Sequence, residues 1–192
     1  MIELSVAPNG FDVELVDTGE VVRGIGGAGQ RQNRLGGHYR ASFTFPPLRG
    51  EVNGRTLKSQ LTAGQSQGVK IELPLPMSQG LPGTPVVDGG GQSGKTLAVR
   101  GLTPYYAGRV GWWLNITAAD GTICLHDISA PFVADASGDA TISIEPALRL
   151  PFADGDAIEL AHPVIAGFAE GVNWNVSLPH LYGFEVTIEE AV

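Results

Sequence analysis

The sequence predicts an all-β fold, a β-sandwich or barrel with one short helix and two β subdomains. Apolar and polar residues alternate in many short segments, which is the pattern of half-buried strands. The 27 glycines and 13 prolines are spread without a period through 192 residues and divide the chain into short pieces. Helical spacing is evident at residues 55–63, where Leu57 and Leu61 stand four apart. The apolar fraction of 43% is that of a globular chain, and a chain of this length can build a core without metals or disulfides.

The N-terminal part is expected to form one β subdomain. Its alternating segments predict strands at residues 2–7, 11–16, 39–45 and 69–75. The first two flank Asn9-Gly10, a strong hairpin turn, so we expect them to pair with each other. Residues 24–37 are glycine-rich and basic and have no apolar period, which predicts a long exposed loop, and loops of this length are usually functional or mobile.

The rest of the chain is expected to hold a linker and an inserted domain. Proline and glycine crowd residues 76–95, and the domain plan places the linker at 81–95. Further strands are predicted at residues 96–100, 110–117, 121–128, 139–145, 156–160, 172–178 and 182–188. The turns Asp120-Gly121 and Asp154-Gly155 are short and local, so residues 96–165 are expected to close into a barrel-like domain. Residues 166–192 are too short to fold alone and are expected to return to residues 1–80, giving a discontinuous first domain.

Charge and cysteine content disfavour several classes of function. The net charge of −8 repels a phosphate backbone, so specific nucleic-acid binding is not expected, although an acidic wall would suit a DNA conduit. The single cysteine, Cys124, lies between two apolar residues and is expected to be buried in a strand. The N-terminus lacks a basic region followed by an apolar run, and no stretch approaches the ~20 apolar residues of a membrane span. We therefore expect synthesis in the cytoplasm without membrane insertion.

Three segments match enzyme motifs, and each lacks the structural context that its motif requires. Residues 24–29 (GIGGAG) fit the dinucleotide fingerprint but no amphipathic helix follows them. Residues 64–68 (GQSQG) fit the nucleophile elbow, with a helix before and a strand after, the reverse of the required order. Residues 89–96 (GGGQSGKT) fit the phosphate-binding loop, yet the residues that follow alternate like a strand. We therefore expect no catalytic residues and a non-enzymatic protein.

Metal and cofactor sites are not expected either. Four histidines are spread along the chain: His38, His126, His162 and His180. None is spaced from another as zinc ligands usually are. Four aspartates crowd turns of the second half: Asp135, Asp139, Asp154 and Asp156. These could bind calcium, but Asp-Gly turns form without a metal.

Four aromatic residues form a candidate contact region: Tyr105, Tyr106, Trp112 and Trp113. The two tryptophans are adjacent, so on a strand one faces the core and the other faces outward. The outward ring and the tyrosines could belong to the core, to a subunit contact or to a carbohydrate platform. Together with basic residues of the predicted loop, the candidate subunit contacts are Arg31, Arg34, Tyr105, Tyr106 and Trp113.

The chain resembles a known family, most clearly over residues 96–163. The likeness is carried by residues 95–104 (KTLAVRGLTP), 135–149 (DASGDATISIEPALR) and 154–160 (DGDAIEL), together with Gly111, Leu125-His126 and Pro163. Residues 30–37 and the Leu57 and Leu61 segment are similar more loosely. This pattern is similar to that of minor or distal tail proteins of long-tailed bacteriophages and prophages, which are encoded near the tape-measure gene.

The resemblance implies a structural component of the virion tail, part of a ring at the distal end of the tail tube. Its expected partners are other copies of the chain, the tail tube, the tape measure and tip or hub proteins. A carbohydrate-binding or host-adsorption module is the alternative function, and a hydrolase or nucleotide enzyme is a third hypothesis. The oligomeric state separates the first two, because rings are obligate assemblies.

Overall fold

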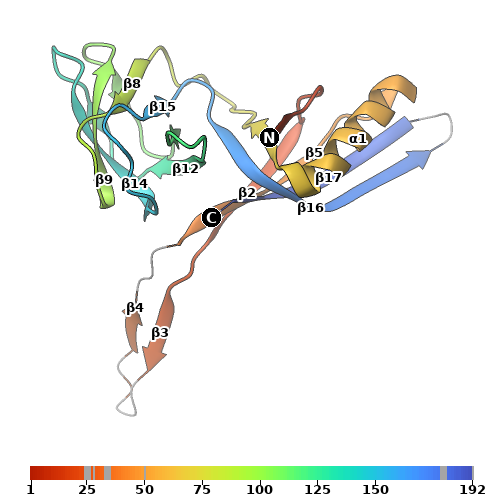
Figure 1. Cartoon of the computed structure of the whole chain (residues 1–192), viewed down its shortest axis with the longest axis horizontal. Coiled ribbons are helices and arrows are strands. Elements are labelled where there is room, and N and C mark those ends of the chain that lie inside the picture. Colours follow the sequence, from red (N-terminus) through yellow and green to blue (C-terminus); the bar gives the residue numbers. More distant parts are fainter. Residues whose placement is uncertain (24–26, 28, 33–35, 50, 178–180, 192) are drawn as a thin grey trace.

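A computed structural model describes residues 1–23, 27, 29–32, 36–49, 51–177 and 181–191. This part of the chain contains one α-helix and seventeen β-strands, so the predicted all-β class with one helix is confirmed. The strands form two main units that lie side by side, an open sheet and a closed barrel (Figure 1).

The open sheet is built from both ends of the chain. Its strand order is β1-β7-β16-β17-β5-β2, and β6 pairs with β17 off this path. The strands are β1 (Ile2–Glu3), β2 (Gly10–Val16), β5 (His38–Thr44), β6 (Leu48–Arg49), β7 (Val69–Glu72), β16 (Val164–Ser177) and β17 (Leu181–Glu190). The C-terminal strands lie at the centre, because β16 pairs with β7 and β17 pairs with β5.

Helix α1 (Glu51–Gln67) covers one face of this sheet (Figure 1). Its Leu57 and Leu61 are fully buried against apolar residues of the strands, such as Phe43 and Ile188. The helix is longer than the predicted 55–63, because its outer turns hold polar residues, glycine and the single exposed Val52, and so carry no apolar period. It ends at Gly68, whose positive φ and N–H bond to the Gly64 carbonyl form a left-handed helix cap.

The predicted hairpin between residues 2–7 and 11–16 is wrong. The strand β1 instead pairs in parallel with β7, and β2 pairs with β5. A two-residue hairpin of the Asn-Gly type needs positive φ at both turn residues, and neither Asn9 nor Gly10 has it. The Asn9 N–H bonds to the Thr44 carbonyl, which directs β2 onto the edge of β5.

A hairpin arm projects from the sheet between β2 and β5 (Figure 1). It consists of β3 (Glu20–Arg23) and β4 (Gly29–Gln32), and all eight strand residues are exposed. The prediction of a loop over 24–37 is therefore wrong for Gly29–Gln32, where polar residues pair as a strand without an apolar period. Residues 24–26, 28 and 33–35 of that predicted loop lie outside the described residues.

The barrel is closed, with the antiparallel strand order β11-β12-β14-β9-β8-β15. Its strands are β8 (Gly83–Val87), β9 (Gly94–Leu102), β11 (Trp113–Thr117), β12 (Ile123–Ile128), β14 (Ala140–Leu148) and β15 (Ala157–Glu159). A separate two-stranded ribbon, β10 (Ala107–Gly108) with β13 (Phe132–Val133), packs on the barrel core through Phe132. Cys124 is buried on β12, as predicted, and turns occur at both predicted Asp-Gly positions.

The predicted linker over 81–95 is wrong at Gly83–Val87, which is a barrel strand, and from Gly94 on, where β9 begins. Glycine and proline in this segment belong to an irregular strand and not to a flexible connection. Gly83 and Gly101 both have positive φ, and the pairing of β8 with β9 shifts register between Gly83 and Val86. The barrel strands thus span residues 83–159, and the sheet resumes at Val164.

Candidate contact surfaces

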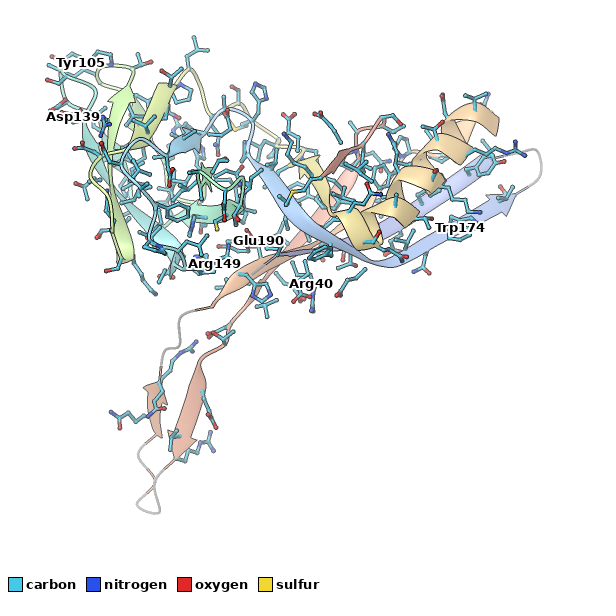
Figure 2. The ribbon with its side chains drawn as sticks, viewed as in Figure 1. Arg40, Tyr105, Asp139, Arg149, Trp174 and Glu190 are labelled. Carbon is cyan, nitrogen blue, oxygen red and sulfur yellow. The ribbon has the colours of Figure 1, made fainter. Side chains whose placement is uncertain are left out.

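A buried carboxylate joins the barrel to the sheet. The Glu190 side chain on β17 is completely buried, and its Oε1 accepts hydrogen bonds from Leu125 N (2.7 Å) and Arg149 Nη2 (3.0 Å). Its Oε2 accepts a hydrogen bond from Tyr39 N (2.7 Å) on β5. Figure 2 places Arg149 and Glu190 where the two units meet. One side chain therefore connects two elements of the barrel and a strand of the sheet.

Two side-chain amides add further connections at this junction. The Asn115 Nδ2 of β11 donates to the Val164 carbonyl (2.7 Å), and Val164 N donates to Asn115 Oδ1 (2.5 Å), so β16 starts on the barrel wall. Gln79 is buried and bonds both the N–H and the carbonyl of Trp113 at 2.7 Å. These bonds fix the chain where it enters and leaves the barrel.

The two adjacent tryptophans face different cores. Trp112 packs against the barrel core and lies 6.4 Å from the Tyr106 ring, whereas Trp113 packs against the sheet and meets Tyr39 edge-on at 5.0 Å. Tyr106 is buried, and its hydroxyl donates to the Gln79 carbonyl (2.6 Å). Tyr106 and Trp113, predicted as subunit contacts, thus pack against residues of the same chain. Tyr105, by contrast, is 70% exposed.

The other predicted contacts belong to the arm. Arg31 lies on β4 with its side chain 57% exposed and pairs with Asp17 at the base of the arm. Arg34 lies outside the described residues. The arm and Tyr105 lie far apart in Figures 1 and 2, so the predicted contact residues do not form one site.

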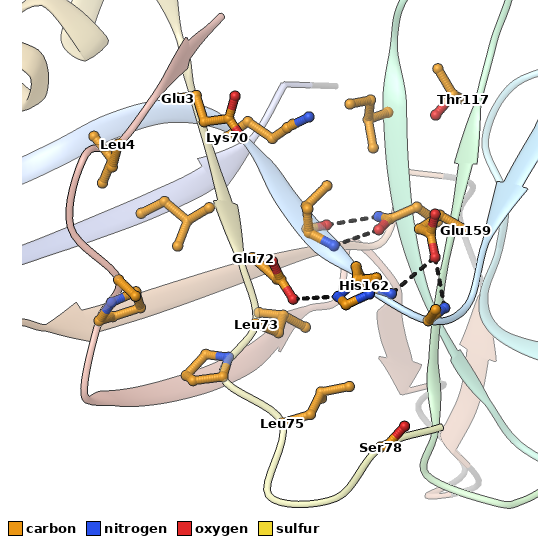
Figure 3. Close-up of a pocket in the computed structure, with 18 of the residues that line it drawn as sticks. Glu3, Leu4, Lys70, Glu72, Leu73, Leu75, Ser78, Thr117, Glu159 and His162 are labelled. Atoms are coloured by element: carbon orange, nitrogen blue, oxygen red, sulfur yellow. Dashed lines mark hydrogen bonds and ion pairs between the residues drawn. The ribbon is translucent and has the colours of Figure 1, made fainter. Parts of the chain in front are cut away.

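A cleft of about 930 Å³ lies between the sheet and the barrel (Figure 3). Glutamates from both units line it, and His162 Nδ1 is 2.8 Å from Glu72 Oε1. The hydrogen bond that His162 donates to the Glu72 carboxylate raises the pKa of His162. Both partners are largely exposed, so this ion pair contributes little to stability. It links β7 to the connection from β15 to β16.

The motif segments lie in the contexts that the sequence predicts, where the structure describes them. Residues 64–67 form the last turn of α1, Gly68 joins it to β7, and Ser66 Oγ donates to the Ala63 carbonyl at 3.2 Å. Residues 89–93 lie in the β8–β9 connection and residues 94–96 begin β9, so Lys95 lies on a strand, with its Nζ 2.6 Å from Glu145 Oε1. Residues 24–26 and 28 of the third motif are not among the described residues.

Three of the four aspartates considered for calcium bond other groups of the chain through their side chains. Asp135 Oδ1 accepts the N–H groups of Ser137 and Asp139, and Asp156 Oδ2 accepts that of Ala153. Asp154 bonds Arg100 and the Gly89 N–H. Within the described part of the chain, no group of three potential metal ligands is found. His180 lies outside that part.

The sheet face opposite α1 is open and acidic. Strand register aligns Glu14, Arg40 and Glu189 in one row across β2, β5 and β17, and Asp12, Ser42, Thr187 and Glu170 in the next. Glu185 follows in a third row beside Thr44. Four of these five carboxylates are exposed, and the fifth, Glu189, is partly buried; Arg40 bonds both Glu14 and Glu189. Sequence reasoning identified the alternation in single strands but not the acidic surface that their alignment creates.

The sheet also has open edges. Among the described residues, β2 pairs only with β5, so its outer side is unpaired over seven residues. At the other edge, β1 covers only Val69 and Lys70 of β7. Unpaired strand edges are templates for pairing with another chain.

No protein-family model matches the chain, and no curated protein is significantly similar to it. No helix in the described residues is long and apolar enough to cross a membrane. The tail-protein resemblance seen in the sequence therefore stays a prediction.

Proposed function

We propose that this protein is a structural, non-enzymatic subunit of a bacteriophage tail tip, which assembles with copies of itself into a ring around the tail channel. The observation that carries the proposal is the sheet with two unlike faces. One face packs against α1 and the barrel, and the other carries Asp12, Glu14, Glu170 and Glu185, all exposed. A subunit of a channel wall needs this division between a packed outer side and a polar inner side.

The charge of the open face suits a conduit for DNA. Carboxylates repel a phosphate backbone, so nucleic acid that passes such a wall is not retained. The aligned rows concentrate this charge on β2, β5, β16 and β17. In the proposed ring this face lines the channel, and the barrel, which lies beside α1 on the packed side, faces outward (Figure 1).

The open edges suit a closed ring of identical subunits. The two edges differ, so edge-to-edge pairing between copies is heterologous, and such contacts close into a ring when the rotation between copies permits. The β2 edge of one copy then meets the edge formed by β7 and β16 of the next. Closure leaves no free edge, which removes the aggregation risk of an open sheet.

The arm supplies a second contact between subunits. A two-stranded ribbon on its own is at best marginally stable in water, and here Val21 and Val22 are 55% and 46% exposed. The arm segment contains Arg23, Arg31 and Arg34 against Glu20, in a chain of net charge −8. These features favour burial of the arm against an acidic surface of a neighbouring subunit or another tail protein.

Electron cryomicroscopy of assembled tails tests this function. The expected result is a ring of copies on the tail axis, six-fold or three-fold, with β2, β5 and β17 turned toward the channel and β2 contacting the next copy. A single copy away from the axis, or a ring with the barrels lining the channel, would refute the proposal.

A further inference from the structure

Tyr105 has a backbone conformation that favours glycine. Tyr106 N bonds to the Thr103 carbonyl (2.9 Å), which closes a β-turn with Pro104 and Tyr105 at its centre. Tyr105 has φ of 62°, and among the described residues it is the one non-glycine with positive φ. Proline followed by a residue of positive φ is typical of a type II turn, which prefers glycine in the second position. A tyrosine here strains the backbone.

Among the described residues, no side-chain contact of Tyr105 compensates for this strain. The Tyr105 side chain is 70% exposed, and in the described residues its ring has no aromatic neighbour and its hydroxyl no hydrogen bond. Tyr106, the next residue, packs on Phe132 and Trp112 and bonds Gln79. The fold therefore uses Tyr106 for its core, and the Tyr105 ring is available to a molecule outside the chain.

The backbone of this turn is bonded to the segment 135–139, which carries two aspartates. Tyr105 N donates to the Asp135 carbonyl (3.3 Å), and Asp135 N donates to the Asp139 carbonyl (2.9 Å), which ties the turn to residues 135–139. The N–H groups of Asp139 and Ser137 hold the pKa of Asp135 below its ordinary value. Asp139 is exposed, and Figure 2 places it with Tyr105 at the end of the barrel farthest from Trp174.

We propose that Tyr105, Asp135 and Asp139 form a binding site for a neutral sugar at the outer end of the barrel. The negative face of a fixed aromatic ring attracts the polarised C–H groups of a sugar. Ionised carboxylates accept hydrogen bonds from its hydroxyl groups. One protruding ring with flanking carboxylates matches one or two sugar units. A stable protein partner needs about 800 Å² on each side, far more than this turn offers. The carboxylates disfavour sialylated or phosphorylated sugars.

The site is independent of the proposed ring. Tyr105 lies on the barrel, remote from the arm and from the open face of the sheet (Figure 2). A sugar can therefore reach it in the isolated chain as well as in an assembly.

The test is an NMR titration of the full chain with chitotriose, maltotriose and lactose, with sialyllactose as the acidic probe. At least one neutral probe is expected to shift amide signals of residues 103–106 and 135–139, and sialyllactose is expected to leave them unchanged. Tyr105→Gly is expected to weaken binding at least tenfold while the melting temperature stays the same or rises, because glycine relieves the strained φ. Tyr105→Phe is expected to keep most of the binding.

Trp174→Ala is the matched control, because Trp174 is 45% exposed on β16 of the sheet unit. It is expected to leave sugar binding unchanged. Failure of every neutral probe to shift these signals would overturn the proposal, as would binding that survives in Tyr105→Gly. Equal loss in Trp174→Ala would mean non-specific stacking and would overturn it too.

Discussion

The barrel and the sheet differ in how completely their strand edges and faces are covered by other parts of the same unit. Every barrel strand is paired on both sides, and seventeen buried residues fill the barrel core. The sheet has an unpaired edge at β2, a short cover on β7, an open acidic face and an arm with both strands exposed. The chain thus contains one unit in which every strand is paired on both sides and one unit whose edge strands are free to pair with another chain. In the proposed assembly, this difference favours the sheet as the unit that contacts other chains.

The difference also concerns chain connectivity. The barrel strands come from one continuous stretch, 83–159, whereas the sheet needs strands from both ends of the chain. The strand β17 lies between β16 and β5 and makes nine registered pairs with β16 and five with β5. Loss of β17 should therefore affect the two units very unequally.

Deletion of residues 172–192 has the largest expected effect. It removes β17 and the outer part of β16, so the remaining strands β5 and β2 lose their connection to β7. We expect residues 1–80 to unfold and the barrel strands, residues 83–159, to stay folded, because the barrel closes through its own strands. Limited proteolysis of the truncated chain should leave a resistant fragment that contains the barrel. A resistant 1–80 fragment with a digested barrel would break the comparison.

Glu190→Ala should destabilise the junction by about 3–5 kcal/mol, because it leaves the buried Arg149 guanidinium without its charge partner. It also leaves the N–H groups of Tyr39 and Leu125 without their acceptor. The measurement is urea unfolding of the full chain. Glu185→Ala on the same strand is the control and should change stability by less than about 0.5 kcal/mol, because Glu185 is exposed. Equal losses in the two variants would mean that Glu190 does not hold the units together.

The barrel should lose stability in acid through His126. Burial lowers the pKa of this histidine to about 4, whereas in the unfolded chain it takes a proton near pH 6.5. Its neutral form therefore contributes stability above pH 6.5 that is lost as the pH falls toward 4, by roughly 3 kcal/mol at most.

Unfolding at pH 7 and pH 5 measures this effect, and His126→Leu should reduce the fall in stability between the two. His162→Gln is the control with the opposite sign. The pKa of His162 is raised by Glu72, so its small contribution is greatest below pH 6.5 and is lost as the pH rises through the folded pKa. If His126→Leu lost as much stability between pH 7 and pH 5 as the natural chain, the acid sensitivity could not be assigned to His126.

Lys95→Ala should have the smallest effect, below about 1 kcal/mol, because its ion pair with Glu145 is at the surface. Folding and assembly should be unchanged. The same variant tests the phosphate-loop motif, since Lys95 lies on a strand rather than at the start of a helix. Nucleotide hydrolysis by the natural chain that disappears in Lys95→Ala would show that the motif is functional.

The sequence predicted the fold class and most strands because alternation is a local signal. The strands near 39–45, 121–128 and 182–188 are all found, and the buried Cys124 follows from the same pattern. Pairing is not local. Asn9-Gly10 suggested a hairpin, but a tertiary bond to Thr44 places β2 beside β5 instead. Proline and glycine suggested a linker where Gly83 and Gly101 shape a bulged barrel strand.

The candidate contacts were predictable only in part, for the same reason. Adjacent tryptophans must face opposite sides of a strand, but the outward Trp113 is covered by the sheet, which sequence spacing cannot indicate. The exposure of Tyr105 depends on a turn conformation that its sequence does not favour. The acidic face arises when residues more than 170 positions apart, such as Glu14 and Glu189, align through Arg40.

Hydrogen–deuterium exchange of the isolated chain and of the chain in assembled tails tests the central claim most directly. The account predicts that amides of β2, β3 and β4 exchange quickly in the isolated chain and become protected on assembly. Amides of β9, β11, β12 and β14 should be protected equally in both states, because the barrel is already closed. Protection gained by the barrel strands, with β2 and the arm unchanged, would contradict the account.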